Sequence, residues 1–202
     1  MTDEAIEFIY GHLLGDGCVA PHKKKACYEQ VSKFPGYLEW IENHLIPVGI
    51  HRTGKIYRRE HNHNGNKYYS YQFVSLSYSE LVEVREKWYS QDNGKQPPQD
   101  LVLTPTMIRQ WFMDDGSFRR PKMKRHSSNG KFYLRRASVR LCNTSFTTES
   151  KEFLAEQLHT FDLEVIIHKD FLYIPVGSTA NFFDTIGPCP LPKIFGYKWP
   201  KS

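Results

Sequence analysis

Two aspartates end two copies of one short pattern in this 202-residue chain. The first copy spans residues 9–17 (IYGHLLGDG) and the second spans residues 108–116 (IRQWFMDDG). Each copy is an apolar helical run that ends in an aspartate and a glycine, and Asp16 and Asp115 lie 99 positions apart. This duplication predicts two similar halves about a pseudo-twofold axis, with paired acids at the seam. Paired carboxylates offer the oxygen ligands that hard divalent cations prefer, and such ions suit phosphodiester hydrolysis.

A lysine followed two residues later by proline closes each half of the chain. Lys95 follows Asp16 by 79 positions, and Lys198 follows Asp115 by 83 positions. An isolated lysine beside a proline turn is a surface residue, but a repeat at near-equal offsets is stronger evidence of duplication than either motif alone. The matching lysines therefore support the interpretation of the chain as two similar halves.

The charge of the chain permits nucleic-acid binding without demanding it. The net charge is +5 and the isoelectric point is near 8.9, and a charge run taken alone indicates a solvated face. The basic residues gather at positions 23–25, 119–125 and 135–140.

Cysteine and histidine spacing gives no sign of a zinc site or a disulfide framework. The four cysteines form no CxxC pair. His61 and His63 fit a polar hairpin loop over residues 61–67 better than a metal site. No signal peptide or long apolar stretch is present, which predicts an intracellular protein, in an organelle or in a prokaryotic cytoplasm.

Hydrophobic periodicity predicts the same order of elements in both halves. Thr2 should cap a first helix that stops at a left-handed Gly17, and Thr104 with Pro105 should start the equivalent second helix. A cap at Ser178 or Thr179 is expected for the last helix. Further helices are expected over 37–47, 79–89, 148–161 and 178–186, and strands over 27–32, 55–59, 68–76, 118–125, 131–142, 165–168 and 171–176.

These motifs resemble those of the LAGLIDADG homing endonucleases, in their single-chain, two-motif form. The second motif is similar to that of the yeast mitochondrial intron-encoded branch, and the two-half layout covers nearly the whole chain. The resemblance implies an α+β fold of two αββαββα halves, packed through their motif helices, whose antiparallel sheets form a saddle on the DNA major groove. The halves would span residues 1–92 and 105–202, with a linker over 93–104.

The resemblance also assigns the site. It implies two or three Mg²⁺ ions held by Asp16 and Asp115, with the neighbouring Gly15 and Asp114 in the same metal site. The catalytic set would then be Asp16, Asp115, Lys95 and Lys198, with the lysines near the acids, where they would stabilise developing negative charge or position the attacking water. Asp114 is a rival to Asp115, which we favour because it directly precedes the glycine as Asp16 does.

Packing of the motif helices should be asymmetric. Gly11 and Gly15 leave one face of the first motif bare, so that another backbone can approach it closely. The second motif has Gln110 and Asp114 at the same positions, which are larger and polar. One side of the seam should therefore be close-packed, and the other should be hydrogen-bonded.

Strand residues would recognise a long, asymmetric double-stranded DNA target as a monomer. Arginine and lysine suit guanine edges and phosphates, whereas asparagine and glutamine suit adenine. The candidates are Gln30, Arg58, Gln72, Arg119, Lys122, Arg136, Arg140 and Asn143.

Three other functions remain open from the sequence. An RNA-binding splicing maturase and a DNA-binding protein without cleavage activity would both use the same fold, although both acids are intact. The third is a plain α+β domain with incidental repeats. Whether the gene sits in an intron, an intein or alone is undecided, although the short ends before Thr2 and after Pro200 leave little room for intein splicing elements.

Overall fold

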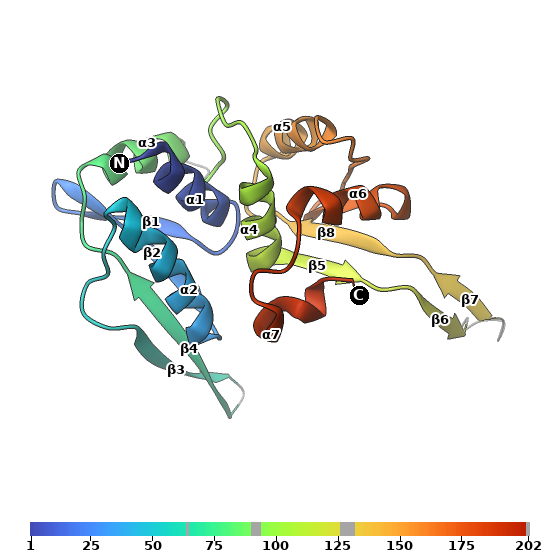
Figure 1. Cartoon of the computed structure of the whole chain (residues 1–202), viewed down its shortest axis with the longest axis horizontal. Coiled ribbons are helices and arrows are strands. Elements are labelled where there is room, and N and C mark those ends of the chain that lie inside the picture. Colours follow the sequence, from blue (N-terminus) through green and yellow to red (C-terminus); the bar gives the residue numbers. More distant parts are fainter. Residues whose placement is uncertain (64, 90–93, 126–131, 201–202) are drawn as a thin grey trace. The chain divides into compact units, whose positions relative to one another are not determined.

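The chain forms two compact units, Met1–Pro98 and Gln99–Ser202. The computed structural model describes residues 1–63, 65–89, 94–125 and 132–200, and Figure 1 follows their path through each unit. The division between the units lies inside the predicted linker, residues 93–104.

The first unit carries a four-stranded antiparallel sheet with strand order β1-β2-β4-β3. The helix that ends in the first motif precedes this sheet, and two further helices follow its hairpins (Figure 1). The elements are α1 (Asp3–Leu13), β1 (Cys18–His22), β2 (Lys25–Ser32), α2 (Pro35–Leu45), a 3-10 turn (Ile46–Val48), β3 (Tyr57–His63), β4 (Asn66–Val74) and α3 (Glu80–Trp88).

The second unit repeats this plan with the sheet order β5-β8-β10-β9 and an additional hairpin of β6 and β7. The predicted hairpin centre, residues 127–130, lies outside the described residues. The elements are α4 (Pro105–Asp115), β5 (Gly116–Arg119), β6 (Lys122–Arg125), β7 (Phe132–Arg135), β8 (Ser138–Cys142), α5 (Thr148–His159), β9 (Ile166–Ile167), β10 (Phe171–Ile174), α6 (Val176–Ile186), α7 (Pro192–Phe195) and a 3-10 turn (Gly196–Lys198). The predicted α+β class with two antiparallel sheets is thus confirmed.

Each sheet has a helix-covered face and an outer face, because side chains alternate along a strand. In the first sheet Tyr28 and Phe73 point to the helices and are fully buried, whereas Val31 on the other face is 39% exposed. In the second sheet Leu141 is fully buried, and Arg140 beside it on β8 points to the opposite face. We call these opposite faces the outer faces.

Threonine caps start both motif helices, as predicted. The Thr2 hydroxyl accepts a hydrogen bond from the amide of Ala5, and the Thr104 hydroxyl accepts one from the amide of Met107. The predicted cap of the last long helix is wrong, because α6 starts after Pro175 without a side-chain cap. The Ser178 hydroxyl instead accepts from the amide of Glu164, which ties α6 to the segment before β9.

The motif glycines serve a different purpose from the predicted left-handed helix end. Neither Gly17 nor Gly116 has a positive φ, and Gly116 is extended, with φ −84° and ψ 155°. A Cβ on Gly17 would lie 2.8 Å from the carbonyl oxygen of His12, and one on Gly116 would overlap the carbonyl oxygen of Phe112. Glycine is therefore required because the chain passes tightly over the last helical turn as it enters the sheet.

The hairpin between β3 and β4 is tighter than predicted. β3 continues through His63, and His61 Nε2 lies 2.7 Å from the Ser70 hydroxyl on β4. Gly65, with φ +78°, follows in the turn, while Asn64 lies outside the described residues. Within the described part of the chain, no helix is long and apolar enough to cross a membrane.

Candidate active site

The first motif presents Asp16 on a turn held by a lysine. Asp16 is exposed and follows the end of α1 by three residues. The ammonium of Lys95 donates to the carbonyl of Gly15 at 2.6 Å and to that of Gly17 at 2.8 Å. The lysine thus grips the backbone on both sides of the acid, which confirms that the Lys-x-Pro segment reaches the first motif.

A buried anchor fixes the approach of Lys95. The amide of Gln96 donates to the carbonyl of Trp88 at 2.8 Å, and Gln96 is 6% exposed. The Trp88 ring packs edge-on against Tyr10 of α1, with 5.4 Å between ring centroids. Lys95 is therefore positioned by the end of α3, which itself packs against the motif helix.

The second motif has the same arrangement, with a more buried lysine. Lys198 is 8% exposed. Its ammonium donates to the carbonyls of Phe112 at 3.2 Å, Met113 at 2.7 Å and Asp114 at 3.1 Å. These are carbonyls at the C-terminal end of α4, where the helix dipole is negative and a cation is stabilising. Asp115, the last residue of α4, directly follows the helical turn whose carbonyls accept hydrogen bonds from Lys198.

The C-terminal segment that carries Lys198 is docked, not a floppy tail. Trp199 is 6% exposed, its ring lies 5.0 Å from the ring of Phe112, and its indole N–H donates to the carbonyl of Gly187 at 2.9 Å. Tyr197, the other aromatic candidate for packing, is 58% exposed. Trp199 is thus the residue that seats the segment.

Arg120 has a structural role that sequence reasoning missed. Its guanidinium donates to the carbonyls of Trp199 at 2.6 Å, Tyr197 at 3.2 Å and Gly196 at 3.4 Å. In the sequence Arg120 is one of a run of basic residues just after the second motif, and nothing in that run indicates that its side chain binds the C-terminal segment. No local signal distinguishes Arg120 from its neighbours.

The charged side chains near the second motif shift the pKa of a cysteine, Cys142. Burial raises the pKa of the Cys142 thiol, the negative charge of Asp115 raises it further, and the positive charges of Lys198 and Arg140 oppose this. In the first half, burial and Glu29 raise the pKa of Cys18, while Lys95 and Arg85 lower it. A thiol of each half therefore lies in the field of the lysine that holds the motif.

The oxygen atoms at the motif ends suit a hard cation. Each half offers an aspartate and backbone carbonyls, which are the oxygen ligands of Mg²⁺. The described residues contain no group of three or more histidine, cysteine or acidic side chains able to hold a metal. Mg²⁺ commonly keeps several waters and uses one or two carboxylates with substrate phosphates, so the residues present fit an ion completed by a nucleic-acid substrate.

The predicted DNA-binding residues fall on different faces. Gln72, Arg119 and Arg140 lie on the outer faces, since they pair in register with outer-face neighbours. Gln30 is fully buried on the helix-covered face, where its amide oxygen accepts from the Tyr28 hydroxyl at 2.8 Å. Arg58 lies on the face opposite to that of Gln72.

The remaining candidates lie beyond the two main sheets. Lys122, the first residue of β6, and Arg136, directly after β7, are both exposed. Asn143 follows β8 and is 4% exposed, and neither atom of its amide has a hydrogen-bond partner among the described residues. DNA contact by all eight residues stays a prediction.

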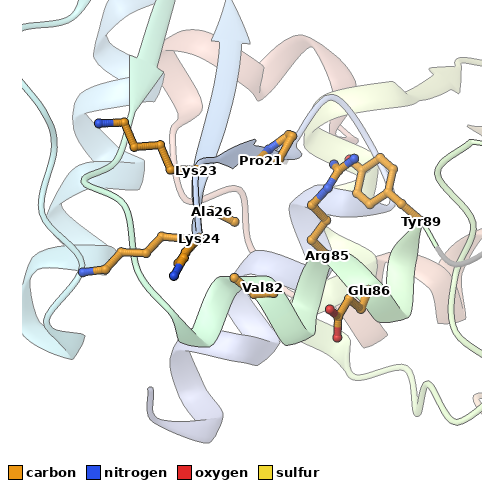
Figure 2. A pocket seen from close by; sticks show the side chains of 9 residues that line it. Pro21, Lys23, Lys24, Ala26, Val82, Arg85, Glu86 and Tyr89 are labelled. Atoms are coloured by element: carbon orange, nitrogen blue, oxygen red, sulfur yellow. The ribbon is translucent and has the colours of Figure 1, made fainter.

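A basic hollow lies at the turn between β1 and β2, beside α3 (Figure 2). Its volume is about 280 Å³. Lys23 and Lys24 extend away from α3, whereas Arg85 points toward Tyr89 and donates to the carbonyl of Val19 at 2.7 Å. The lysines are exposed, which agrees with the solvated face expected of a charge run. The lining residues are Pro21, Lys23, Lys24, Lys25, Ala26, Val82, Arg85, Glu86 and Tyr89.

Comparison with known protein families assigns the chain to a family. The LAGLIDADG DNA endonuclease family matches residues 6–181. The chain belongs to this family. Its two motif helices, α1 and α4, stand one in each unit, which agrees with the predicted two-motif, single-chain form of LAGLIDADG proteins.

Relatives of this LAGLIDADG chain differ in length and name. An uncharacterised protein of Methanocaldococcus jannaschii is 24% identical over 215 residues, covering 100% of this chain and 79% of that protein. Protein RecA of Mycobacterium gastri is 25% identical over 209 residues, covering 95% of this chain but 46% of RecA. The cytochrome b mRNA maturase bI2 of Debaryomyces hansenii is 29% identical over 125 residues, covering 57% of this chain and 47% of the maturase.

Solved structures agree on the fold. The homing endonuclease I-WcaI bound to its DNA recognition sequence matches with a TM-score of 0.79 and 22% identity, covering 100% of this chain and 88% of that chain. The N-terminal LAGLIDADG domain of DUF199/WhiA matches with a TM-score of 0.53 and 16% identity, covering 92% and 82%. I-SmaMI, bound to an uncleaved DNA target in the presence of calcium ions, matches with a TM-score of 0.51 and 13% identity, covering 91% and 85%.

Proposed function

We propose that this protein is a site-specific, metal-dependent DNA endonuclease that hydrolyses one phosphodiester bond on each strand of a long, asymmetric duplex target. The observation that supports this best is the matched geometry of the two motif ends. In each half a lysine ammonium donates to the carbonyl of the residue before the motif aspartate, at 2.6 Å for Gly15 and 3.1 Å for Asp114. Two equivalent acids suit two scissile bonds on opposite strands.

In this proposal Asp16 and Asp115 would hold Mg²⁺, with the carbonyls of Gly15 and Asp114 beside them. The bound ion would polarise the scissile phosphate and lower the pKa of an attacking water. Lys95 and Lys198 keep the backbone before each acid in place. They also supply positive charge near the scissile phosphate, where negative charge develops in the transition state. Two or three divalent ions would serve the two motifs.

The distribution of charge supports a polyanionic partner. Residues 1–98 hold twelve basic and twelve acidic side chains, whereas residues 99–202 hold fifteen basic and ten acidic ones. The whole excess of +5 therefore belongs to the second half. Lysine and arginine that neutralise phosphates supply most non-specific DNA affinity, so the second half is expected to contribute more of this attraction than the first.

The test is cleavage of a duplex library with a randomised site, in Mg²⁺ and in EDTA. We expect double-strand cuts in Mg²⁺ only. Asp16→Asn and Asp115→Asn should each abolish double-strand cleavage but retain most DNA binding, because a carboxamide lacks the charge that holds Mg²⁺. Asp184→Asn, an exposed aspartate of α6, is the matched control and should cut normally.

The same experiment separates Asp115 from its rival. Normal cutting by Asp115→Asn together with loss of cutting by Asp114→Asn would transfer the metal role to Asp114. Tight duplex binding without any cutting in Mg²⁺ or Mn²⁺ would instead make the protein a cleavage-inactive binding protein.

A splicing maturase is the second candidate, favoured by the similarity to the cytochrome b mRNA maturase over 57% of the chain. A maturase would bind a structured intron transcript and accelerate its splicing. Splicing assays on such transcripts with the Asp16→Asn variant would show whether the stimulation of splicing persists without the metal site. Persistence would mean that the two activities use different residues.

A further inference from the structure

Two central side chains occupy equivalent positions in the two sheets. Cys18, the first residue after the first motif glycine, pairs with Glu29 on β2. Ser117, the first residue after the second motif glycine, pairs with Arg140 on β8. β2 and β8 each have a strand on both sides. Glu29 and Arg140 therefore occupy equivalent positions on the outer faces of the two sheets. Each pairs with the second residue after a motif aspartate, Cys18 after Asp16 and Ser117 after Asp115.

Equivalent neighbours support both side chains. Gln72 of β4 pairs with Val31, two residues after Glu29, and its amide donates to the Glu29 carboxylate at 2.7 Å. Phe171 of β10 pairs with Cys142, two residues after Arg140, and its ring centroid lies 4.3 Å from the guanidinium carbon. In both halves the same position of the third strand thus orients the side chain of the second strand.

The supported groups keep hydrogen-bonding capacity. A carboxylate has about four lone-pair positions, and Gln72 occupies only one of those on Glu29. Cys27 Sγ lies 3.7 Å from the other carboxylate oxygen. The Arg140 guanidinium lies over the ring of Phe171, and this contact does not use a carbonyl or carboxylate acceptor that would occupy its N–H donors. Both side chains are half-buried, so each presents an oriented polar edge.

The chemistry of the two edges is opposite. Glu29 can only accept hydrogen bonds, and near DNA phosphates it would be repelled, so its natural partner is an amino group on a base edge. In the major groove glutamate accepts from the N4 amino group of cytosine. Arg140 can only donate, and arginine makes its most common specific contact with the O6 and N7 atoms of guanine.

We propose that Glu29 and Arg140 are the equivalent base-reading residues of the two halves, Glu29 for a cytosine and Arg140 for a guanine. This assignment rests on the proposed function, because it requires that the outer faces meet the DNA major groove. The target is then asymmetric at one pair of equivalent positions, where the first half reads cytosine and the second half reads guanine. Gln72 and Phe171 act as positioning residues that hold the two readers.

The experiment is binding enrichment from a duplex library with a randomised site, in Ca²⁺, followed by sequencing. Wild-type protein should enrich a C·G pair in one half-site and a G·C pair at the equivalent position of the other, when each half-site is read 5′ to 3′ along its own equivalent strand. Glu29→Gln should move the first preference toward adenine, because glutamine reads adenine, and Arg140→Gln should do the same at the second position only. Each change should alter discrimination at that base pair by about ten- to a hundredfold.

Controls separate reading from folding. Glu39→Gln, on the exposed surface of α2, should leave every preference unchanged. If Glu29→Gln does not fold, Glu29→Asp should weaken discrimination at the same base pair while keeping cytosine preferred. Gln72→Leu should weaken the same position without shifting the preferred base.

The outcomes also separate this inference from the proposed function. Enrichment of a duplex site with an identical base distribution for wild type and Glu29→Gln overturns the assignment of Glu29 and leaves the endonuclease proposal standing. A uniform loss of affinity at all positions makes Glu29 structural and overturns it as well. Failure of the wild type to enrich any duplex overturns both proposals.

Discussion

The ammonium of Lys198 donates a hydrogen bond to the main-chain carbonyl of Asp114 at 3.1 Å, directly before Asp115. Lys95 makes the equivalent bond to Gly15, at 2.6 Å, directly before Asp16. An aspartate at the C-terminal end of a helix is disfavoured by the helix dipole. A lysine on the same carbonyls offsets this penalty and fixes where the acid stands, so acid and lysine form one unit in each half.

Loss of Lys198 should affect both stability and the strand balance of cleavage. Lys198→Met leaves three carbonyls of α4 without the one ammonium that they share, and the loss of a charged hydrogen-bonding partner costs about 1.5–3 kcal/mol. We expect a loss of about 2–3 kcal/mol in the free energy of unfolding and the accumulation of nicked product, because in the proposed function each half would serve one scissile bond.

Denaturant unfolding and strand-resolved cleavage kinetics measure these two effects. Lys193→Met, on the exposed surface of α7, is the control and should change neither. Equal cleavage of both strands at the wild-type rate by Lys198→Met, or normal cleavage by a chain that ends at Gly196, would remove Lys198 from the site.

Arg120 should be needed to keep the C-terminal segment docked. Arg120→Ala removes the donor to the carbonyls of Trp199 and Tyr197, so the segment that carries Lys198 should loosen. We expect a lower melting temperature and the same excess of nicked product as in Lys198→Met. Arg119→Ala is the matched contrast: Arg119 lies on the outer face, so the DNA affinity should fall while the melting temperature stays. The opposite pattern would exchange the two roles.

Much of the fold followed from local patterns in the sequence. The caps at Thr2 and Thr104 and the alternation of Tyr28 with Val31 express local backbone and burial rules. The repeat of Asp16 and Lys95 at Asp115 and Lys198 predicted that distant segments meet, and each half does bring its lysine to its motif. The periodicity of residues 79–89 likewise gave α3 to within one residue.

Other features depend on contacts that no local pattern encodes. Gly17 and Gly116 are required because the chain passes close to its own helix at both positions, so the prediction of a left-handed Gly17, which came from a rule for helix ends, was wrong. Arg120 turns toward the chain end because of tertiary geometry. The equivalence of Glu29 and Arg140, which carry opposite charges, is visible only from the register in which their strands pair.

The close approach at Gly116 should make it intolerant of any side chain. The Cβ of Gly116→Ala would overlap both Phe112 Cδ2 and the Phe112 backbone, so the backbone must move. Overpacking costs about 1–3 kcal/mol and occasionally more. Gly177→Ala is the control, since nothing lies within 4 Å of its Cβ and its φ is not positive, and alanine in α6 should stabilise by about 0.5–1 kcal/mol. Equal unfolding free energies for the two variants would contradict the close approach.

Cys27 should make the protein less stable at alkaline pH. Burial, followed by the charge of Glu29, raises the pKa of its thiol from 9.0 to about 11. The unfolded thiol ionises near pH 9 and the folded one does not, so its contribution is complete below pH 9 and is lost as the pH rises to about 11. The melting temperature should fall across this range, and Cys27→Ser should fall less. Parallel pH profiles for wild type and Cys27→Ser would show that Cys27 has an ordinary pKa.

The last prediction concerns the bare face of the first motif. Gly11 and Gly15 are both buried, and the sequence predicts that this face meets the second motif helix at close range. A leucine at Gly15 would separate the backbones, at a typical cost of about 1–3 kcal/mol. If the two motif helices form one seam, Gly15→Leu should lower the melting temperature of the whole chain in a single transition. Glu4→Leu adds the same side chain to the exposed surface of α1 and should leave melting almost unchanged. Equal melting temperatures for the two variants would show that Gly15 faces no tightly packed partner.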